Sequence, residues 1–323
     1  MKMQRDVTAF ADAISVHVGC RVNGDFHPAA ESFSEDVRSL EGVGRLLGHS
    51  ITAMLSSSDM DALIDGVARR VAADTSRYDT DHRSVTRLLS APNFKPLSIA
   101  RVAGGTLQAR KEGEQSQQFQ WTAERETTSV VTYSAASAFT RESAINSEWD
   151  LLANLAQELT AGGYRRERAE LVTVVEANGT LSDGVAQFDG SRGNVQTGTL
   201  SVATVGAAMS KLRALAGADG TPLELAPGVL MVPGDAEADA LTIVESMGLM
   251  RRVRVWADSR LSAAYLCPDP MVQPVFGIVH IDRSRDPIVN SKRQPRTDSW
   301  TLKAVHDCCA VALTPRAVKM TIE

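Results

Sequence analysis

The chain has 323 residues, 43% hydrophobic and 23% charged, which supplies enough apolar side chain for a sizeable core and enough charge for solubility. No apolar stretch approaches the ~20 residues that cross a bilayer, and the first ten residues lack the apolar block of a signal peptide, so we expect neither a membrane span nor secretion. The formal net charge of -5 argues against tight nucleic-acid binding, which needs a basic surplus on one face.

Four cysteines are present: Cys20, Cys267, Cys308 and Cys309. The last two are adjacent, and such a pair bridges only with strain. None has the spacing of a C-x-x-C metal motif. We therefore expect four reduced thiols, as in a cytosolic protein.

The N-terminal region, residues 1–90, is polar and predicts helical pieces. Residues 56–59 supply N-cap chemistry for a helix in which Leu63, Val67 and Val71 form one apolar stripe. The rest of this helix is charged. We expect its single stripe to dock on the main body of the chain or on another subunit.

After the prolines of residues 92–96, helix signals disappear. Residues 106–111 and 117–133 predict two extended arms around a turn at residues 112–114. The arms contain few apolar side chains, and a two-stranded hairpin with little to bury is marginal in water. We expect this hairpin to be mobile or to be clamped by another chain.

The clearest helical pattern follows, with Thr140 as its N-cap and an apolar stripe over residues 145–159. Gly162 and Gly163 interrupt the pattern, which then resumes to Val175. Either one bent rod or two helices result. A continuous rod from Glu142 to Ala177 would be roughly 50 Å long, more than a compact domain of this size needs.

The remaining residues predict an α/β block and returning strands. Residues 181–198 read as a loop, and Thr199 or Ser201 caps the next helix. The later elements are short strands at 223–225 and 229–232, a helix over 235–248 through Ala240, Leu241 and Val244, a one-sided strand at 253–255, and strands at 275–281 and 300–312. A basic polar loop with Lys292, Arg293 and Arg296 separates the last two strands.

Catalytic motifs of the phosphate-binding, zinc-protease, EF-hand and serine-hydrolase types are absent from the sequence. A metal could be bound by the side chains of Asp79, Asp81 and His82. The polar end of a helix has the same residue types, however, and we favour that interpretation. Residues 306–308 alternate between the two faces of a strand, so they do not pair a nucleophile with its base. The arginine run at 165–168 is interpreted as a solvated face.

Several different short sequence motifs follow one another in a characteristic order between about residues 50 and 312. They are Ser56-Ser57-Ser58-Asp59, Asn93-Phe94-Lys95, Glu112-Gly113-Glu114, Leu181-Ser182-Asp183-Gly184, Gly193-Asn194, residues 221–227 running into Leu230-Met231-Val232-Pro233, and His306-Asp307. With this order and spacing, the chain resembles the major capsid (head) proteins of tailed bacteriophages with the Hong Kong 97-type fold, and most closely their Mu-like head-subunit branch.

The resemblance implies an α+β fold and a division of the chain into five parts. These are an N-terminal arm or helical region (1–96), an E-loop hairpin (97–135), a peripheral domain with a long spine helix (136–198), an axial domain (199–274) and a return to the peripheral domain (275–323). In the E-loop, the residues expected to contact a neighbouring subunit are Lys111, Glu112, Glu114, Phe119 and Trp121.

The function that the resemblance implies is structural and not enzymatic. The subunit would assemble in the host cytoplasm, through pentamers and hexamers, into the icosahedral shell of a virion around packaged double-stranded DNA held by weak nonspecific contact. Portal, scaffold, maturation-protease or decoration proteins are the other implied partners. No cofactor, metal or membrane is expected.

Two alternatives remain open at this point. One is an encapsulin-like shell of the same fold that stores a cargo enzyme in place of DNA. The other is a soluble α/β enzyme that uses His280, Asp282 and His306 in a pocket between the α/β block and the returning strands. The enzyme alternative requires these three side chains to converge on one concave site.

Overall fold

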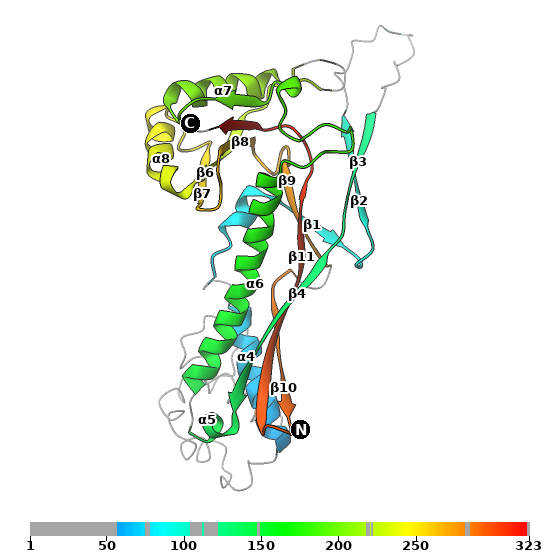
Figure 1. Ribbon diagram of the computed structural model, residues 1–323, viewed down its shortest axis with the longest axis vertical. Coiled ribbons are helices and arrows are strands. Elements are labelled where there is room, and N and C mark those ends of the chain that lie inside the picture. The colour runs from blue at the N-terminus through cyan, green and yellow to red at the C-terminus, as the bar shows by residue number, and fades with distance from the viewer. Residues whose placement is uncertain are drawn as a thin grey trace. The chain divides into compact units, whose positions relative to one another are not determined.

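The computed structural model describes residues 57–74, 78–103, 112, 122–146, 149–217, 220, 222–281 and 285–321. The chain forms two compact units (Figure 1). The first unit comprises residues 1–79, 132–166 and 283–307, and the second comprises residues 80–131, 167–282 and 308–323. Among the described residues, no helix combines the length and the apolarity needed to cross a bilayer.

The first unit is a small sheet with helices packed on it. Its elements are α4 (Ser57–Ala73), most of β4 (Val131–Thr140), α5 (Arg141–Ile145), the N-terminal part of α6 (Trp149–Ala177), β10 (Ile288–Gln294) and the N-terminal part of β11 (Ser299–Ala312). Strand β10 runs antiparallel to β11, with Ile288 opposite Val305. Strand β4 also pairs with β11.

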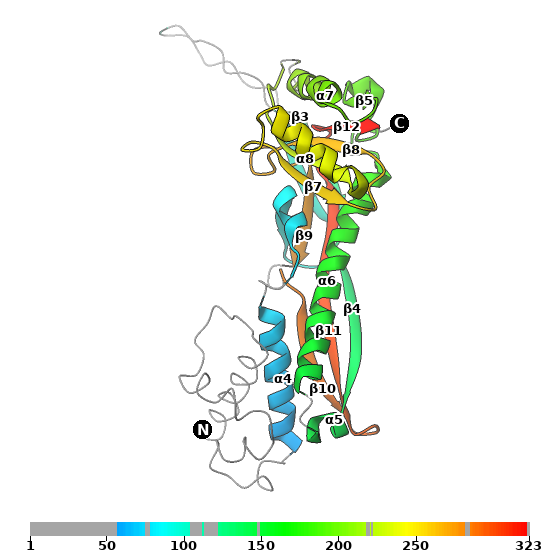
Figure 2. The same cartoon turned by 90° about the vertical axis from the view of Figure 1, so that its left-hand side faces the viewer.

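The predicted stripe of α4 is confirmed, because Leu63, Val67 and Val71 are all buried. They share one core with residues of α6 and of the sheet, including Leu152 and Leu302. Figure 2 shows α4 beside β10 and α6. The stripe therefore docks on the chain's own first unit, which is the first of the two alternatives that the sequence left open.

Thr140 caps a helix as predicted, accepting a hydrogen bond from the Ser143 backbone N–H at 3.2 Å. The capped helix is the short α5, however, and α6 begins separately at Trp149. Helix α6 then runs for 29 residues, about 43 Å at 1.5 Å per residue. It passes through Gly162 and Gly163 without a break, so the rod is continuous over the glycine pair.

The two glycines have different surroundings. A Cβ added at Gly163 would lie 2.5 Å from Cγ of Pro287, whereas one added at Gly162 would meet no atom within 4 Å. We expect Gly163→Ala to lower the free energy of unfolding by about 1–3 kcal/mol through overpacking, and Gly162→Ala to raise it by up to about 1 kcal/mol through helix propensity. Urea denaturation of both variants measures this, and equal effects would refute the Pro287 contact.

The second unit contains a mixed five-stranded sheet covered on both faces. Its strand order is β5 (Val195–Thr197), β12 (Val318–Thr321), β8 (Ala264–Pro268), β6 (Pro227–Pro233) and β7 (Arg254–Asp258). Helices α7 (Val202–Ala214) and α8 (Glu237–Ser246) share one core on one face, and the C-terminal part of α6 packs in another core with residues of the other face. Ser201 forms a capping box with Thr204 at the start of α7, which decides between the two caps that the sequence allowed.

The second unit also holds four further strands and three short 3-10 helices. The strands are β1 (Arg87–Ala91), β2 (Leu97–Ala103), β3 (Thr122–Thr128) and β9 (Phe276–Ile281), and the 3-10 helices are η4 (Asp81–Val85), η5 (Gly190–Arg192) and η6 (Gly234–Ala236). Strand β1 is parallel to β9, which is antiparallel to the C-terminal part of β11. Strands β2 and β3 form an antiparallel pair, with Leu97 opposite Thr128.

Three predicted elements need correction. The second hairpin arm does not continue to Tyr133, because β3 ends at Thr128 and the chain moves on to pair with β11 as β4. Residues 223–225 form no strand, and part of the predicted basic loop is strand β10, whose exposed Lys292 alternates with inward residues. The first arm, residues 106–111, lies outside the described residues.

Candidate functional site

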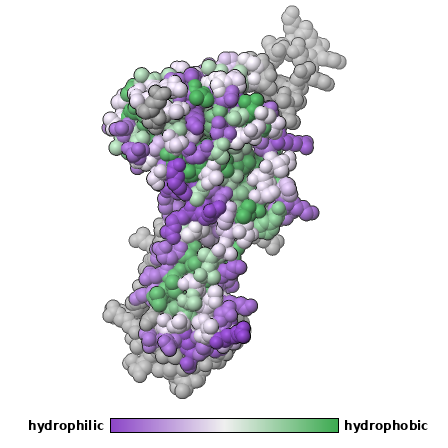
Figure 3. Space-filling view, in the orientation of Figure 1, coloured by the Kyte–Doolittle hydropathy of each residue, from purple (hydrophilic) through white to green (hydrophobic). Residues whose placement is uncertain are grey.

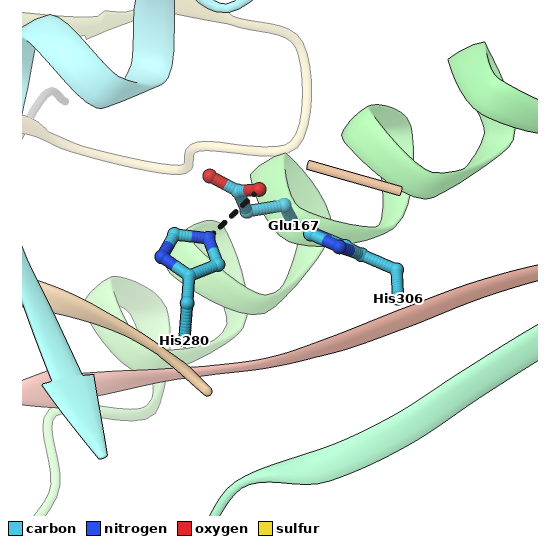
Figure 4. A group of neighbouring side chains, drawn as sticks. All are labelled: Glu167, His280 and His306. Atoms are coloured by element: carbon cyan, nitrogen blue, oxygen red, sulfur yellow. Dashed lines mark ion pairs between the residues drawn. The ribbon is translucent and has the colours of Figure 1, made fainter. Parts of the chain in front are cut away.

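A buried carboxylate, Glu167 of α6, organises the polar interior of the second unit. Oε1 of Glu167 lies 3.0 Å from Nε2 of His82 and accepts a 2.7 Å hydrogen bond from Nε of Arg83. Oε2 accepts a second bond from Arg83 at 2.8 Å and lies 3.2 Å from Nε2 of His280 (Figure 4). Glu167 is 1% exposed. We call Glu167 with His82, Arg83 and His280 the Glu167 cluster, and we infer that it stabilises the packing of η4, α6 and β9 on one another.

The candidate residues from the sequence do not assemble into one site within either unit. His82 is buried against Glu167, while Asp79 and Asp81 are exposed, which fits the helix-end interpretation of these letters. His280 belongs to the second unit, and His306, which Figure 4 also labels, belongs to the first. Asp282 lies outside the described residues.

The arginine run is only partly a solvated face. Arg165 and Arg166 are exposed, but Arg168 donates to Oδ2 of Asp258 at 2.6 Å and to the carbonyl of Ala257 at 2.6 Å. Arg260 donates three further bonds to the same carboxylate, from its guanidinium at 2.8 and 2.7 Å and from its backbone N–H at 3.0 Å. Burial raises the pKa of Asp258, but the hydrogen bonds from Arg260 and Arg168 outweigh burial and hold this pKa well below its usual range.

The strand over residues 306–308 alternates as expected. His306 and Cys308 are buried, and Asp307 accepts a 2.7 Å hydrogen bond from the Thr132 hydroxyl on the other face. The described cysteines, Cys267, Cys308 and Cys309, are free and buried. Burial raises the pKa of Cys267 to about 12, which keeps its thiol protonated and unreactive.

A loop after β8 presents apolar side chains to solvent. Met271 and Val272 are 77% and 79% exposed. Asp269 holds the loop, because its side chain accepts from the Met271 N–H at 2.8 Å and its carbonyl accepts from Val272 and Gln273.

A groove lies within the first unit, between β4 and α6. Its volume is about 690 Å³. The walls are Tyr133, Ser134, Ala135 and Ser137 of β4, and Leu155, Glu158, Leu159, Gly162, Gly163, Arg165 and Arg166 of α6, with Pro287, Ala304 and His306 completing the lining. In the lower half of Figure 3, hydrophobic residues gather on the part of the surface where Figure 1 shows α6 and β4. We call this the β4–α6 groove.

Of the predicted hairpin contacts, only Glu112 falls among the described residues, and it is exposed in a turn. Lys111, Glu114, Phe119 and Trp121 lie outside them. The base of the hairpin is hydrogen-bonded to the rest of the second unit. The carboxylate of Glu126 accepts hydrogen bonds from the backbone N–H and the hydroxyl of Ser182, at 2.9 and 2.8 Å.

A family model described as "Phage capsid protein" matches residues 124–320 of the chain. The chain belongs to this phage capsid protein family. It is therefore a structural protein of a virion shell and not an enzyme, and it works as an assembly of copies. No curated protein sequence matches it significantly.

Solved structures share the fold at low identity. The mature capsid of bacteriophage PhiM1 is 12% identical over 76% of this chain and 87% of that chain, with a TM-score of 0.50. The capsid of cyanophage P-SCSP1u is 8% identical over 76% and 89%, also at 0.50. An encapsulin complex from Synechococcus elongatus is 10% identical over 73% and 85%, at 0.47. The α+β fold of Hong Kong 97 type, expected from the sequence, is confirmed.

Proposed function

We propose that this phage capsid protein is the major head subunit of a tailed phage, of the Mu-like branch, and that it closes through pentamers and hexamers into an icosahedral shell around double-stranded DNA. The observation that carries the proposal is the family match over residues 124–320. The order of the sequence motifs supports the Mu-like branch. Assembly in the host cytoplasm, and portal, scaffold, maturation-protease or decoration partners, follow from the same proposal.

The mode of contact with DNA follows from charge. The net charge of -5 leaves no general basic surplus for the phosphate backbone. DNA inside such a shell is therefore held by weak, nonspecific contacts. A strongly basic inner wall would bind the genome tightly and oppose its packing and release.

We assign a role in the shell to parts of the chain, using the five-part division given above. Within the proposed E-loop of residues 97–135, the part before β4 begins at Val131 reaches across a neighbouring subunit, with Lys111, Glu112, Glu114, Phe119 and Trp121 as its contacts. Residues 199–274 supply the axial domain, and α6 supplies the spine helix.

Deleting residues 106–121 tests the hairpin. Among the described residues, only the exposed Glu112 lies in this segment, so we expect the variant to fold with the wild-type circular dichroism spectrum and a cooperative transition. Without its clamp it should form no shells, which electron microscopy and sedimentation measure. A globally unfolded variant, or one that still forms shells, would contradict the proposed role of the hairpin.

Nuclease treatment of assembled particles separates the proposed head from an encapsulin-like compartment. Particles from infected or lysogenic cells should protect double-stranded DNA. Particles that protect no DNA but hold a co-purified protein cargo would contradict DNA packaging.

A further inference from the structure

Strand β4 leaves one edge open to a further strand. It pairs with β11, and no other strand in the described part of the chain pairs with it. The open edge carries backbone N–H and C=O groups that can template another strand. Tyr133, Ser134 and Ala135 are consecutive, yet all three line the β4–α6 groove. Because side chains alternate between the faces of a strand, three consecutive residues line one cavity only where it follows the strand edge.

The opposite wall of the groove combines partly exposed leucines with charged side chains. Glu158 pairs with Arg165 at 3.1 Å, and the Arg166 guanidinium lies 4.3 Å from the centre of the Tyr133 ring. Leu155 and Leu159 are only half-buried, and the space above Gly162 is open, since an added Cβ would meet nothing within 4 Å. A volume of about 690 Å³ lies within the usual range of ligand pockets. A free strand edge facing a helix wall with partly exposed leucines is an arrangement that binds an extended peptide.

One segment of the chain outside the described residues has the pattern of such a peptide. Although the N-terminal region as a whole predicts helical pieces, residues 14–22 read Ile-Ser-Val-His-Val-Gly-Cys-Arg-Val, with an apolar residue at every second position. This alternation, with four β-branched apolar residues, predicts a strand with one apolar face. Residues 23–56 separate it from α4, and 34 residues reach up to roughly 110 Å when extended, so the connection does not limit where the strand docks.

We propose that residues 14–22 bind in the β4–α6 groove as an added strand on the open edge of β4. Their backbone pairs with β4, and the side chains of Ile14, Val16 and Val18 pack on Leu155 and Leu159. The occupied groove would close the sheet edge and cover the two leucines at once. This goes beyond the proposed shell function and does not depend on it.

Two variants of the full-length chain test the proposal from opposite sides. Val16→Asp with Val18→Asp places charge on the apolar face of the segment, and Gly162→Leu fills the groove. The matched controls are Ser15→Asp on the other face of the segment and Gly206→Leu, a helical glycine of α7 that also has no atom within 4 Å of an added Cβ.

Two readouts report on the two partners. Hydrogen exchange of the peptide covering residues 131–140 reports on the edge of β4. Alkylation under native conditions reports on Cys20, because Cys267, Cys308 and Cys309 are buried. We expect both test variants to raise both rates about tenfold or more and both controls to leave them unchanged. The two test changes combined should do no more than either alone, since they remove the same contact.

Three results would overturn the proposal. The first is a wild-type Cys20 that reacts as fast as in denaturant. The second is β4 exchange that none of the variants changes. The third is a Gly162→Leu variant that exposes β4 without any change at Cys20, which would mean that another partner fills the groove.

Discussion

Glu167→Gln is expected to lower the free energy of unfolding by about 3–5 kcal/mol, because it breaks a buried ion pair and leaves the other charge without compensation. Glu167 is almost fully enclosed and receives two hydrogen bonds from Arg83, with His82 and His280 also against it. The amide of glutamine keeps the shape but presents an N–H where an acceptor is needed. Urea denaturation of the unassembled subunit measures the loss.

The control is Glu158→Gln on the same helix. The side chains of Glu158 and its partner Arg165 are 72% and 65% exposed, so their pair contributes at most about 1 kcal/mol. A Glu167→Gln variant as stable as Glu158→Gln would show that the Glu167 cluster does not fasten the second unit.

Asp258→Asn is expected to cost roughly 2–4 kcal/mol at neutral pH, since it removes the shared acceptor of Arg168 and Arg260. The carboxyl of Asp258 is 4% exposed, and its pKa is held below the ordinary value. A depressed folded-state pKa stabilises the protein above the unfolded-state value of about 3.9, and this stabilisation is lost as the pH falls toward the folded-state pKa. The difference between wild type and variant should therefore shrink below about pH 4.

Asp298→Asn is the matched control for this titration. Asp298 also pairs with two arginines, Arg141 and Arg293, but it is about half exposed, and asparagine tolerates its positive φ. We expect a change below about 1 kcal/mol. A stability difference between wild type and Asp258→Asn that is constant from pH 7 to pH 3 would contradict the assigned role of the carboxyl.

Local patterns predicted most helices well. The stripe of α4 and the Ser201 cap of α7 depend on residues within a few positions of one another, so the sequence alone carries their signal. Strand β10 was missed because its outer face is polar and because its inner face is covered only once α4 packs on it. At this contact Asp65 of α4 accepts a hydrogen bond from the Ser291 N–H at 2.9 Å. Its burial comes from a partner more than 200 positions away.

The Glu167 cluster was missed for the same physical reason. The Arg-Arg-Glu-Arg run has the charges of a solvated helix face, and only the fold brings His82, Arg83 and His280 to Glu167. Arg168 was misread likewise, since its partner Asp258 is 90 residues away. The signal that the sequence did carry is that residues 165–168 are consecutive. Successive helical residues step by about 100° around the axis, so four of them cover most of the circumference and cannot all lie on one solvated face.

The most direct test of the shell function is electron microscopy of the purified full-length protein over a range of concentration and salt. Closed particles with icosahedral symmetry, built from five- and six-fold clusters of this subunit, are the predicted result. Monomers or small open oligomers under every condition would contradict it.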